Sequence, residues 1–290
     1  MLSQQDAVAK GVMSRAEIVV IENAVPGPEP ALPELLLNAI DQPETVCPVW
    51  TKLMSADEWD VYRSAIQAVR TAGVRFMIGG AFGLAAYTGR WRNTKDLDLF
   101  VLPRDRDRTV QTLTELGFDD YYESLAYDRG WIYRAIQSDV LVDVIWGTPN
   151  RRTEVDELWH RNASRMLLRS ELVDVIPAEE LLWIKLYVLQ RDRCDWTDLI
   201  NLLYATAGVL DWDRVRERLA GDLPLLTGLL SVFAWVCPDR IAAIPADLRK
   251  RAGIRKPRRE ALGPDLQRIG LLDSRPWFAA HQPCDQPMRL

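Results

Sequence analysis

Two patterns of apolar and polar residues alternate along the middle of the chain. Between residues 52 and 165, short apolar runs typical of strands are interleaved with stretches in which apolar residues recur every three or four positions, as in amphipathic helices. From 166 to 240 the helical pattern dominates. The chain is therefore predicted to be an α+β protein, in which a small mixed β-sheet with helices on one side forms the first domain and a helical domain follows.

The individual elements follow from these patterns and from local end signals. Ser55 and Glu58 form a capping box ahead of the first helix. Pro177 stands where the first helix of the second domain begins, a position that suits its fixed φ angle. Strands are expected at 74–78, 96–102, 119–126, 131–137 and 138–147, and helices at 56–72, 81–88, 105–116, 153–162, 177–191, 196–206, 211–220 and 223–236.

The two ends of the chain differ from this middle part. Residues 1–51 are predicted to be an N-terminal arm, because the stretch AVPGPEPALPELL holds four prolines. Residues 241–290 are rich in proline and arginine and are predicted to be an irregular tail. Within this tail, RKRAGIRKPRR (Arg249–Arg259) carries seven basic residues and no acidic one. That run is either a contact for a polyanion or a solvated stretch of chain.

Composition narrows the chemistry. The 290 residues carry a net charge of −5, so the chain as a whole is not expected to bind nucleic acid. Its four cysteines lie far apart without a C-x-x-C pair, which favours reduced thiols in the cytoplasm. With two histidines, any metal is expected to be a hard cation held by carboxylates. A secretory signal and an apolar run of about 18 residues are both missing, so no membrane span is expected.

Two glycines stand between a predicted strand and a short predicted helix, in the stretch FMIGGAFGLAAYTGRWRNTKDLDLFV that begins at Phe76. The backbone of Gly79 and Gly80 has no Cβ atom, so it can turn sharply and let a phosphate group approach its amides. The positive end of the helix dipole would add to that attraction. An ordinary turn is the alternative interpretation of this pair.

Two aspartates follow on the next predicted strand. Asp96 and Asp98 alternate with leucines, so both carboxylates point to the same face. Positions two residues apart on a strand are separated by about 6.7 Å, and carboxylates on such stems can converge on two divalent ions about 4 Å apart. The alternative is the solvated polar face of a half-buried strand.

A third aspartate interrupts a later apolar run, VLVDVIW (140–146). A continuous apolar run predicts a central strand that is covered on both faces, where the lone carboxylate of Asp143 would be costly to bury. A metal ion shared with Asp96 and Asp98 would offset that cost. The alternatives are a buried charge satisfied by another partner and a strand-end residue at the surface.

The order of these features resembles the DNA polymerase β-type nucleotidyltransferase superfamily, which has a strand, Gly-Gly or Gly-Ser, a short helix, Asp-x-Asp on the next strand and a third acid on a later strand. The lead-in from Arg92 to Lys95 is similar to that of the AbiEii-like toxin branch, and antibiotic nucleotidyltransferases are further relatives. The resemblance covers residues 74–147 and, more weakly, 177–203. Gly80 replaces the commoner serine, which removes one phosphate-contacting hydroxyl.

The resemblance also implies roles in the second domain. Lys185, which has apolar neighbours on its predicted helix, matches the lysine that binds the triphosphate, and snorkelling to solvent is the alternative. Asp195 or Asp198, at the start of the next helix, matches an acid that is either a base for the acceptor or an orienting group. The alternative is that Asp195 is an N-cap and Asp198 its N3 residue.

The implied reaction moves a nucleoside monophosphate from an NTP to an acceptor and releases pyrophosphate. Asp96 and Asp98 would hold Mg²⁺, or Mn²⁺, on the triphosphate, and Asp143 would complete a second metal site. Gly79, Gly80 and Lys185 would hold the phosphates. The acceptor, whether an antibiotic, a tRNA or a protein, and the identity of the NTP stay open. A catalytically inactive binding or regulatory protein with the same fold is the alternative.

Overall fold

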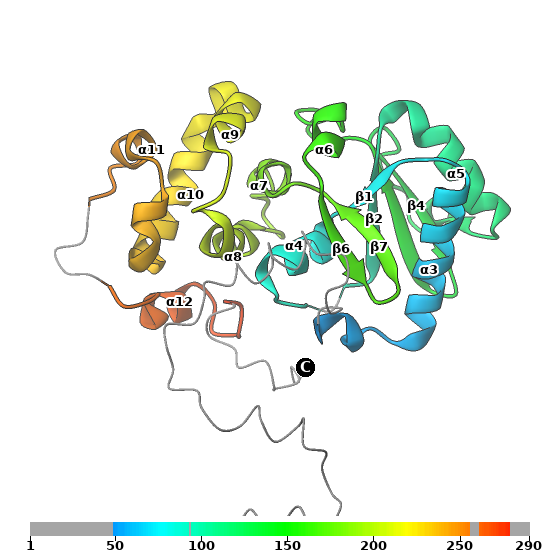
Figure 1. Cartoon of the computed structure of the whole chain (residues 1–290), viewed down its shortest axis with the longest axis horizontal. Helices are drawn as coiled ribbons and strands as arrows, with labels where there is room; N and C mark the ends of the chain where they lie inside the picture. Colours follow the sequence, from blue (N-terminus) through cyan, green and yellow to red (C-terminus); the bar gives the residue numbers. More distant parts are fainter. Residues whose placement is uncertain (1–48, 93, 256–260, 279–290) are drawn as a thin grey trace, which may run out of the picture. The chain divides into compact units, whose positions relative to one another are not determined.

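The computed structural model describes residues 49–92, 94–255 and 261–278 and contains a mixed sheet of seven strands (Figure 1). The strand order is β3-β4-β5-β2-β1-β7-β6. Strands β2 and β5 pair in parallel, as do β1 and β7, and the remaining neighbours are antiparallel. The strands are β1 (Phe76–Ile78), β2 (Asp96–Val101), β3 (Asp119–Asp120), β4 (Ile132–Gln137), β5 (Val140–Ile145), β6 (Ser164–Leu168) and β7 (Glu171–Val175).

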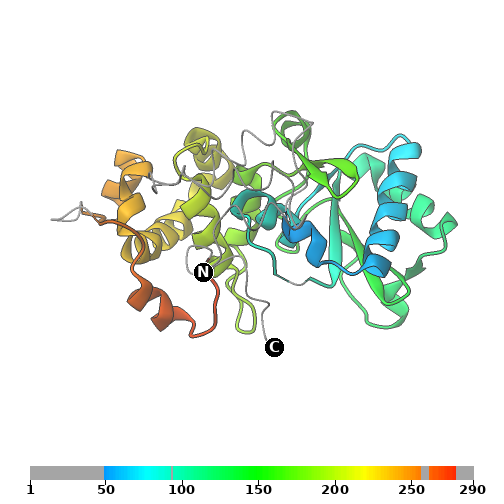
Figure 2. The ribbon, with the colours of Figure 1, turned by 60° about the horizontal axis from the view of Figure 1, so that its bottom comes forward.

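Two helices cover one face of this sheet. Helix α3 (Ala56–Thr71) and helix α5 (Arg106–Glu115) lie side by side in both ribbon views and pack against β4 and β5 (Figure 1, Figure 2). The predicted capping box is present at the start of α3, where the Ser55 hydroxyl accepts from the Glu58 N–H. Leu97 and Leu99 are fully buried in the core. The predicted α+β fold is confirmed.

The helices that follow the sheet agree closely with the predicted positions. Most of the predicted elements are found within a few residues of their expected ends. The expected helix at 177–191 ends earlier, at Leu186, because Leu189 and Cys194 then pair as an isolated bridge. The remaining helices are α4 (Gly80–Thr88), α6 (Glu157–Arg161), α7 (Ala178–Leu186), α8 (Trp196–Thr206), α9 (Trp212–Leu219), α10 (Leu223–Val236), α11 (Ala246–Arg251) and α12 (Leu266–Leu272).

The hairpin of β6 and β7 was not predicted, and it carries the sheet past residue 165 to Val175. Its two-residue turn contains Arg169 at a φ of 52°, a conformation that usually calls for glycine or asparagine and so hides the hairpin in the sequence. The Arg169 guanidinium donates to the carbonyls of Thr51 and Met54 at 3.0 and 2.5 Å. These long-range bonds hold a turn that its local sequence does not favour.

Another predicted strand is much shorter than expected. The strand predicted at 119–126 is reduced to the two residues of β3, because Tyr121–Glu123 turns into a 3₁₀ helix. The Asp120 carboxylate accepts from the Tyr122 N–H at the start of that turn. A local side-chain bond thus ends the strand, which is a common role for aspartate.

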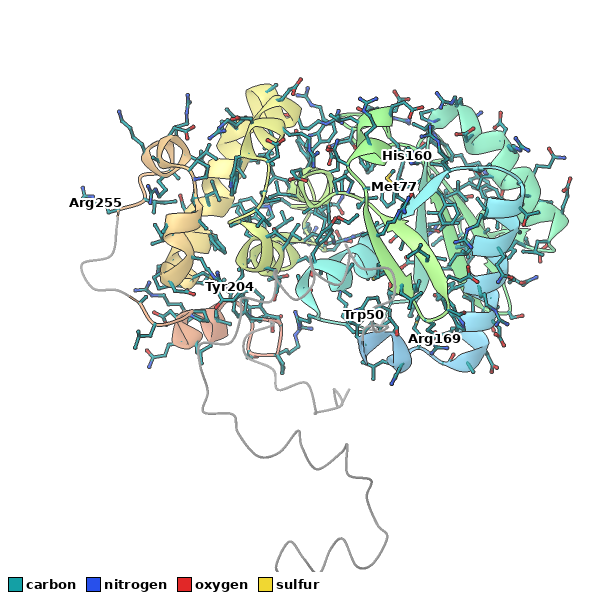
Figure 3. All side chains as sticks on the ribbon, viewed as in Figure 1. Trp50, Met77, His160, Arg169, Tyr204 and Arg255 are labelled. Carbon is teal, nitrogen blue, oxygen red and sulfur yellow. The ribbon has the colours of Figure 1, made fainter. Side chains whose placement is uncertain are left out.

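The C-terminal part is more ordered than predicted. Two helices, α11 and α12, form in the segment that was expected to be irregular. After α12 the chain buries Phe278 completely. The Phe278 ring packs edge-on, at 5.0 Å between centroids, against Tyr204 of α8, which is labelled in Figure 3. The Asn201 amide of α8 also donates to the Trp277 carbonyl at 2.9 Å. The predicted arm up to residue 48 and part of the basic run, 256–260, lie outside the described residues.

One stretch, Trp212–Val236, is long and apolar enough to cross a membrane by length and composition. It comprises α9, α10 and the short turn between them. The inward face of α10 includes Leu226, Leu229 and Phe233, all of which are fully buried in the protein. One face of α10 therefore packs into the hydrophobic core, while 39% of the apolar 18-residue window within the stretch is buried.

Substitution of Phe278 tests whether the C-terminal segment is part of the core. Phe278→Ala is expected to lower the free energy of unfolding by about 3–5 kcal/mol, the usual effect of removing a fully buried ring. Urea unfolding followed by tryptophan fluorescence measures this change. Leu262→Ala, at a fully exposed side chain of the same region, is the control and should have little effect. Equal stability of the two variants would contradict the docking of this segment.

Candidate active site

Parallel pairing of β2 and β5 brings the three predicted aspartates together. Asp98 lies directly opposite Asp143 in the register of these strands, and Asp96 lies opposite Leu141. One carboxylate oxygen from each aspartate lies within 4.8 Å of the other two. Asp96 is further held by the Thr94 hydroxyl, which donates to Oδ1 at 2.6 Å. We call Asp96, Asp98 and Asp143 the acid cluster.

Crowding of these carboxylates changes their acidity. The pKa of Asp98 lies well above its usual value, first because the group is buried and then because Asp96 and Asp143 repel its negative charge. Burial likewise raises the pKa of Asp143 to about 6, although its arginine partner acts in the opposite direction. The cluster therefore carries unfavourable negative charge, which a bound cation would relieve.

Gly79 and Gly80 make room for the acid cluster. Gly80 has a φ of +54°, and a Cβ atom there would lie 1.6 Å from Oδ2 of Asp98. A Cβ atom on Gly79 would lie 2.3 Å from the ring of Phe100, and the Gly79 N–H donates to the carbonyl of Asp98 at 3.1 Å. The group that approaches Gly80 in this structure is a carboxylate of the same chain, and the predicted approach of a phosphate stays a prediction.

An arginine that the sequence interpretation missed also belongs to this cluster. Arg134 lies opposite Asp143 in the β4–β5 register. Its Nε and Nη2 donate to the two oxygens of Asp143, both at 2.9 Å, and Nη2 also reaches Asp96 Oδ2 at 3.5 Å. Asp143 thus has a satisfied partner and lies in the acid cluster at the same time. The contact of Arg134 with Asp143 follows from the β4–β5 register, and no local pattern in the sequence signals it.

Lys185 of α7 is buried and forms ion pairs instead of reaching solvent. Its Nζ donates to Asp195 Oδ2 at 2.6 Å and to Asp198 Oδ2 at 2.8 Å, and the lysine is 4% exposed. The snorkelling alternative is therefore wrong. Asp195 occupies the N-cap position of α8, but its side chain makes no capping bond, because both oxygens accept from cations.

Two further arginines complete this second group of charges. Arg193 donates from Nε and Nη2 to the two oxygens of Asp195, both at 3.0 Å, and Arg92 reaches Asp198 at 3.2 Å. Burial would raise the pKa of Asp195, but Lys185 and Arg193 outweigh it, so this pKa lies below its usual value. We call Lys185, Asp195, Asp198, Arg193 and Arg92 the ion-pair cluster.

The two clusters are close enough to act on each other. The positive charges of Lys185 and Arg193 both lower the pKa of Asp98, against the larger effects of burial and of its acidic neighbours. Negative charge at Asp98 in turn favours the charged form of Arg193. Elements β2, β5, α7 and α8 therefore place three carboxylates beside a set of cations, an arrangement suited to a ligand that combines metal ions with phosphates.

The acid cluster fits a hard divalent cation. Its donor set consists of three carboxylates, the ligand type that Mg²⁺ and Mn²⁺ prefer. Their oxygens already converge from two strands, and Gly80 keeps the space beside Asp98 free of a Cβ atom. Burial first, and then the neighbouring negative charges, raise the pKa values of Asp98 and Asp143. Asp96, Asp98 and Asp143 are the residues that would hold the metal.

A separate cavity of about 530 Å³ runs between α5 and β4. Arg106, Phe118, Tyr133 and Trp146 are among its lining residues, and no member of the acid cluster or the ion-pair cluster lines it. The candidate site is therefore defined by converging charged groups and not by this cavity.

A Gly-Gly turn next to converging carboxylates on a mixed sheet, with the buried Lys185 close by, is the arrangement expected of a nucleotidyltransferase. A family model agrees with this class, and it covers more than half of the chain. The chain belongs to the family described as uncharacterised nucleotidyltransferase, NTP_transf_5, which matches residues 66–232. This range includes every residue of both clusters.

Solved structures give more distant likenesses. The antibiotic-resistance factor ANT(2'')-Ia is 16% identical with a TM-score of 0.44, over 61% of this chain and 97% of that one. The lincosamide antibiotic adenylyltransferase LnuA is 16% identical with a TM-score of 0.39, over 53% and 99%. JHP933 from Helicobacter pylori is 13% identical with a TM-score of 0.36, over 69% and 89%. No curated protein matches the chain.

Exchange of Gly80 for alanine tests the fit between the glycine turn and Asp98. Gly80→Ala is expected to destabilise the fold by about 1–2 kcal/mol, because alanine is strained at positive φ, and to displace the Asp98 carboxylate. Mn²⁺ binding, followed by electron paramagnetic resonance of the free ion, should weaken strongly.

Gly83→Ala provides the matched control for this test. A Cβ atom at Gly83 of α4 would meet only ordinary contacts, the nearest at 3.7 Å. This variant should keep Mn²⁺ binding and gain up to about 1 kcal/mol of stability from helix propensity. Normal Mn²⁺ affinity in Gly80→Ala would refute the proposed contact between the turn and the metal-binding carboxylate.

Proposed function

We propose that the protein transfers a nucleoside monophosphate from an NTP to an acceptor and releases pyrophosphate, with Mg²⁺ or Mn²⁺ bound by the acid cluster. The observation that carries this proposal is the convergence of three carboxylates from β2 and β5 within 4.8 Å, beside Gly80. A divalent metal bound there would neutralise charge on the triphosphate and favour ionisation of the attacking oxygen. Membership of a nucleotidyltransferase family supports the reaction class.

Each residue of the acid cluster has a proposed role. Asp96 and Asp98 lie on one strand and would bind the metal that holds the triphosphate. Asp143, on the neighbouring strand, would complete the second metal site, next to the attacking oxygen. Its bidentate bond with Arg134 fixes the orientation of its carboxylate, so the residue is held in place before substrates bind.

The phosphates are proposed to lie between the glycine turn and the ion-pair cluster. An ammonium group has three donors, and Lys185 uses two of them on Asp195 and Asp198, which leaves a third for a phosphate oxygen. Arg193 is mostly exposed and its charge already acts on Asp98, so it is a second phosphate contact. The N–H of Gly79 already donates to the carbonyl of Asp98, so Gly79 would form the turn without donating to a phosphate. Gly80 lies at the start of α4.

Asp195 and Asp198 are proposed to orient the cations and not to accept the proton of the acceptor. The lowered pKa of Asp195 makes it a weak base, because a general base works best when its pKa is near the operating pH. Both carboxylates already accept hydrogen bonds from Lys185, Arg193 or Arg92. They would hold the positive side chains of the ion-pair cluster in place beside the acid cluster.

The finer features of the sequence interpretation belong to the same proposal. They include an AbiEii-like branch, ATP as the nucleotide, a cytoplasmic location, and a polyanion contact through Arg249–Arg259. The acceptor is an antibiotic, a tRNA or a protein. Incubation with each α-labelled NTP against aminoglycoside and lincosamide panels, tRNA and cell extract identifies both nucleotide and acceptor. Absence of label transfer together with metal-dependent NTP binding would favour the inactive, regulatory alternative.

Substitution of Asp98 tests the metal site. Asp98→Asn is expected to abolish Mg²⁺-dependent transfer, because an amide replaces a carboxylate poorly as a ligand for a hard dication. The same variant should be at least as stable as the wild type at pH 7. Since the folded-state pKa of Asp98 is raised, its ionisation costs stability above the unfolded value of about 3.9, and asparagine removes that cost. Transfer assays and thermal unfolding measure the two effects. Wild-type turnover would overturn the assignment.

Substitution of Lys185 separates its two proposed contacts. Lys185→Met leaves two buried carboxylates without this partner and should lower stability by about 3 kcal/mol at neutral pH. Because the pKa of Asp195 is lowered in the folded state, the stability that its ionised carboxylate contributes is lost as the pH falls. The difference in free energy of unfolding between the wild type and Lys185→Met should therefore narrow below about pH 4. The control Lys52→Met, at an exposed residue, should change stability by less than about 0.5 kcal/mol.

The same pair of variants tests the contact with nucleotide. Dissociation constants for NTP at fixed Mg²⁺ should rise in Lys185→Met by about tenfold to a hundredfold, the loss that corresponds to one charge-assisted hydrogen bond. Lys52→Met should bind NTP as the wild type does. Matching constants for wild type and Lys185→Met would show that Lys185 serves only to neutralise Asp195 and Asp198.

A further inference from the structure

Arg134 lies where a cation at the acid cluster would also have to bind. Its guanidinium occupies both oxygens of Asp143 at 2.9 Å and approaches Asp96 at 3.5 Å. A divalent ion bound by the cluster would use oxygens of the same two carboxylates. Arg134 and the metal ion are therefore competitors for the same ligands, although both reduce the same crowding of negative charge.

The surroundings of Arg134 hold its backbone in place and leave its side chain partly exposed to solvent. The Tyr127 hydroxyl accepts from the backbone N–H of Arg134 at 3.0 Å, and the Tyr121 ring lies 5.8 Å from its guanidinium carbon. The hydroxyl of Tyr127 donates in turn to Asp120 at 2.9 Å. The side chain of Arg134 is 26% exposed, whereas that of Asp143 is 4% exposed. The backbone is thus anchored while the guanidinium borders solvent.

We propose that Arg134 is a counter-cation which keeps the affinity of the acid cluster for divalent metal low until nucleotide binds. With the guanidinium on both oxygens of Asp143, the charge at the acid cluster is one unit less negative than it would be without Arg134. A triphosphate brings oxygen ligands for the metal and also accepts hydrogen bonds from a guanidinium, so it can draw Arg134 away from Asp143. Metal and nucleotide would then load together. The inference rests on the proposed function, because it requires the acid cluster to be the metal site.

Removal of the charge should strengthen binding of the metal alone. Arg134→Gln is expected to bind Mn²⁺, without nucleotide at about pH 8, at least about tenfold more tightly than the wild type, a factor equal to 1.4 kcal/mol. Electron paramagnetic resonance of free Mn²⁺ measures the affinity, and circular dichroism confirms the fold. Equal or weaker binding in a folded Arg134→Gln variant would overturn the inference.

Arg165→Gln is the matched control. Arg165 faces Asp174 across the β6–β7 pair of the same sheet at 3.5 Å, so the substitution removes the same charge from another cross-strand pair. It should leave Mn²⁺ affinity within about twofold of the wild type, because its charge is not at the acid cluster and exposed charges are screened. An equal gain in both variants would reduce the effect to net charge and would also overturn the inference.

Two further variants keep the test decisive. If Arg134→Gln does not fold, the double variant Arg134→Gln/Asp143→Asn removes both partners and is compared with Asp143→Asn alone. The double variant should bind Mn²⁺ more tightly, and equal affinities would count against the inference. Asp98→Asn separates this question from the proposed function: if it binds Mn²⁺ as the wild type does, the metal site itself is wrong. If Asp98→Asn loses binding and Arg134→Gln gains none, only the role of Arg134 fails.

Discussion

The parallel pairing of β2 with β5 is the constraint on which the site depends. It sets Asp98 opposite Asp143 in the register, and with Asp96 two residues earlier on β2, it concentrates three negative charges within 4.8 Å. Such a concentration is unstable by itself, as the raised pKa values of Asp98 and Asp143 indicate. The groups around the three carboxylates reduce this repulsion, and the remaining negative charge would attract a metal ion.

Three features of the structure reduce the repulsion between the carboxylates or accommodate it. Arg134 neutralises part of the charge directly, through two hydrogen bonds to Asp143. The buried Lys185 and the exposed Arg193 act on Asp98 from α7 and the turn that follows it. Gly80 accommodates the Asp98 carboxylate by having no side chain. The structure thus keeps a costly arrangement of charge at the candidate site and balances it with groups from several elements, a departure from optimal stability that is common in active sites.

The ion-pair cluster links the helical region to the sheet through pairs of opposite charges. Lys185, Asp195 and Asp198 are all buried, so each requires a partner of opposite charge. Arg92, which lies in the lead-in to β2, bonds to Asp198 on α8. A change at the acid cluster is therefore coupled electrostatically to α7 and α8. The ion pairs of Lys185 with Asp195 and Asp198 explain why a lysine on an otherwise apolar helix face is compatible with a folded core.

Local sequence determined the elements and the identity of the acids. Periodicity predicted most helices and strands, and the alternation in DLDLFV placed Asp96 and Asp98 on one face, because side-chain direction along a strand is a local property. Only the tertiary structure decided which groups meet. The role of Arg134 depends on the register of β4 against β5. The partners of Lys185 depend on the turn between α7 and α8. The β6–β7 hairpin depends on hydrogen bonds from Arg169 to residues more than 100 positions away. Contacts of this kind are set by packing between distant segments, and no local pattern in the sequence encodes them.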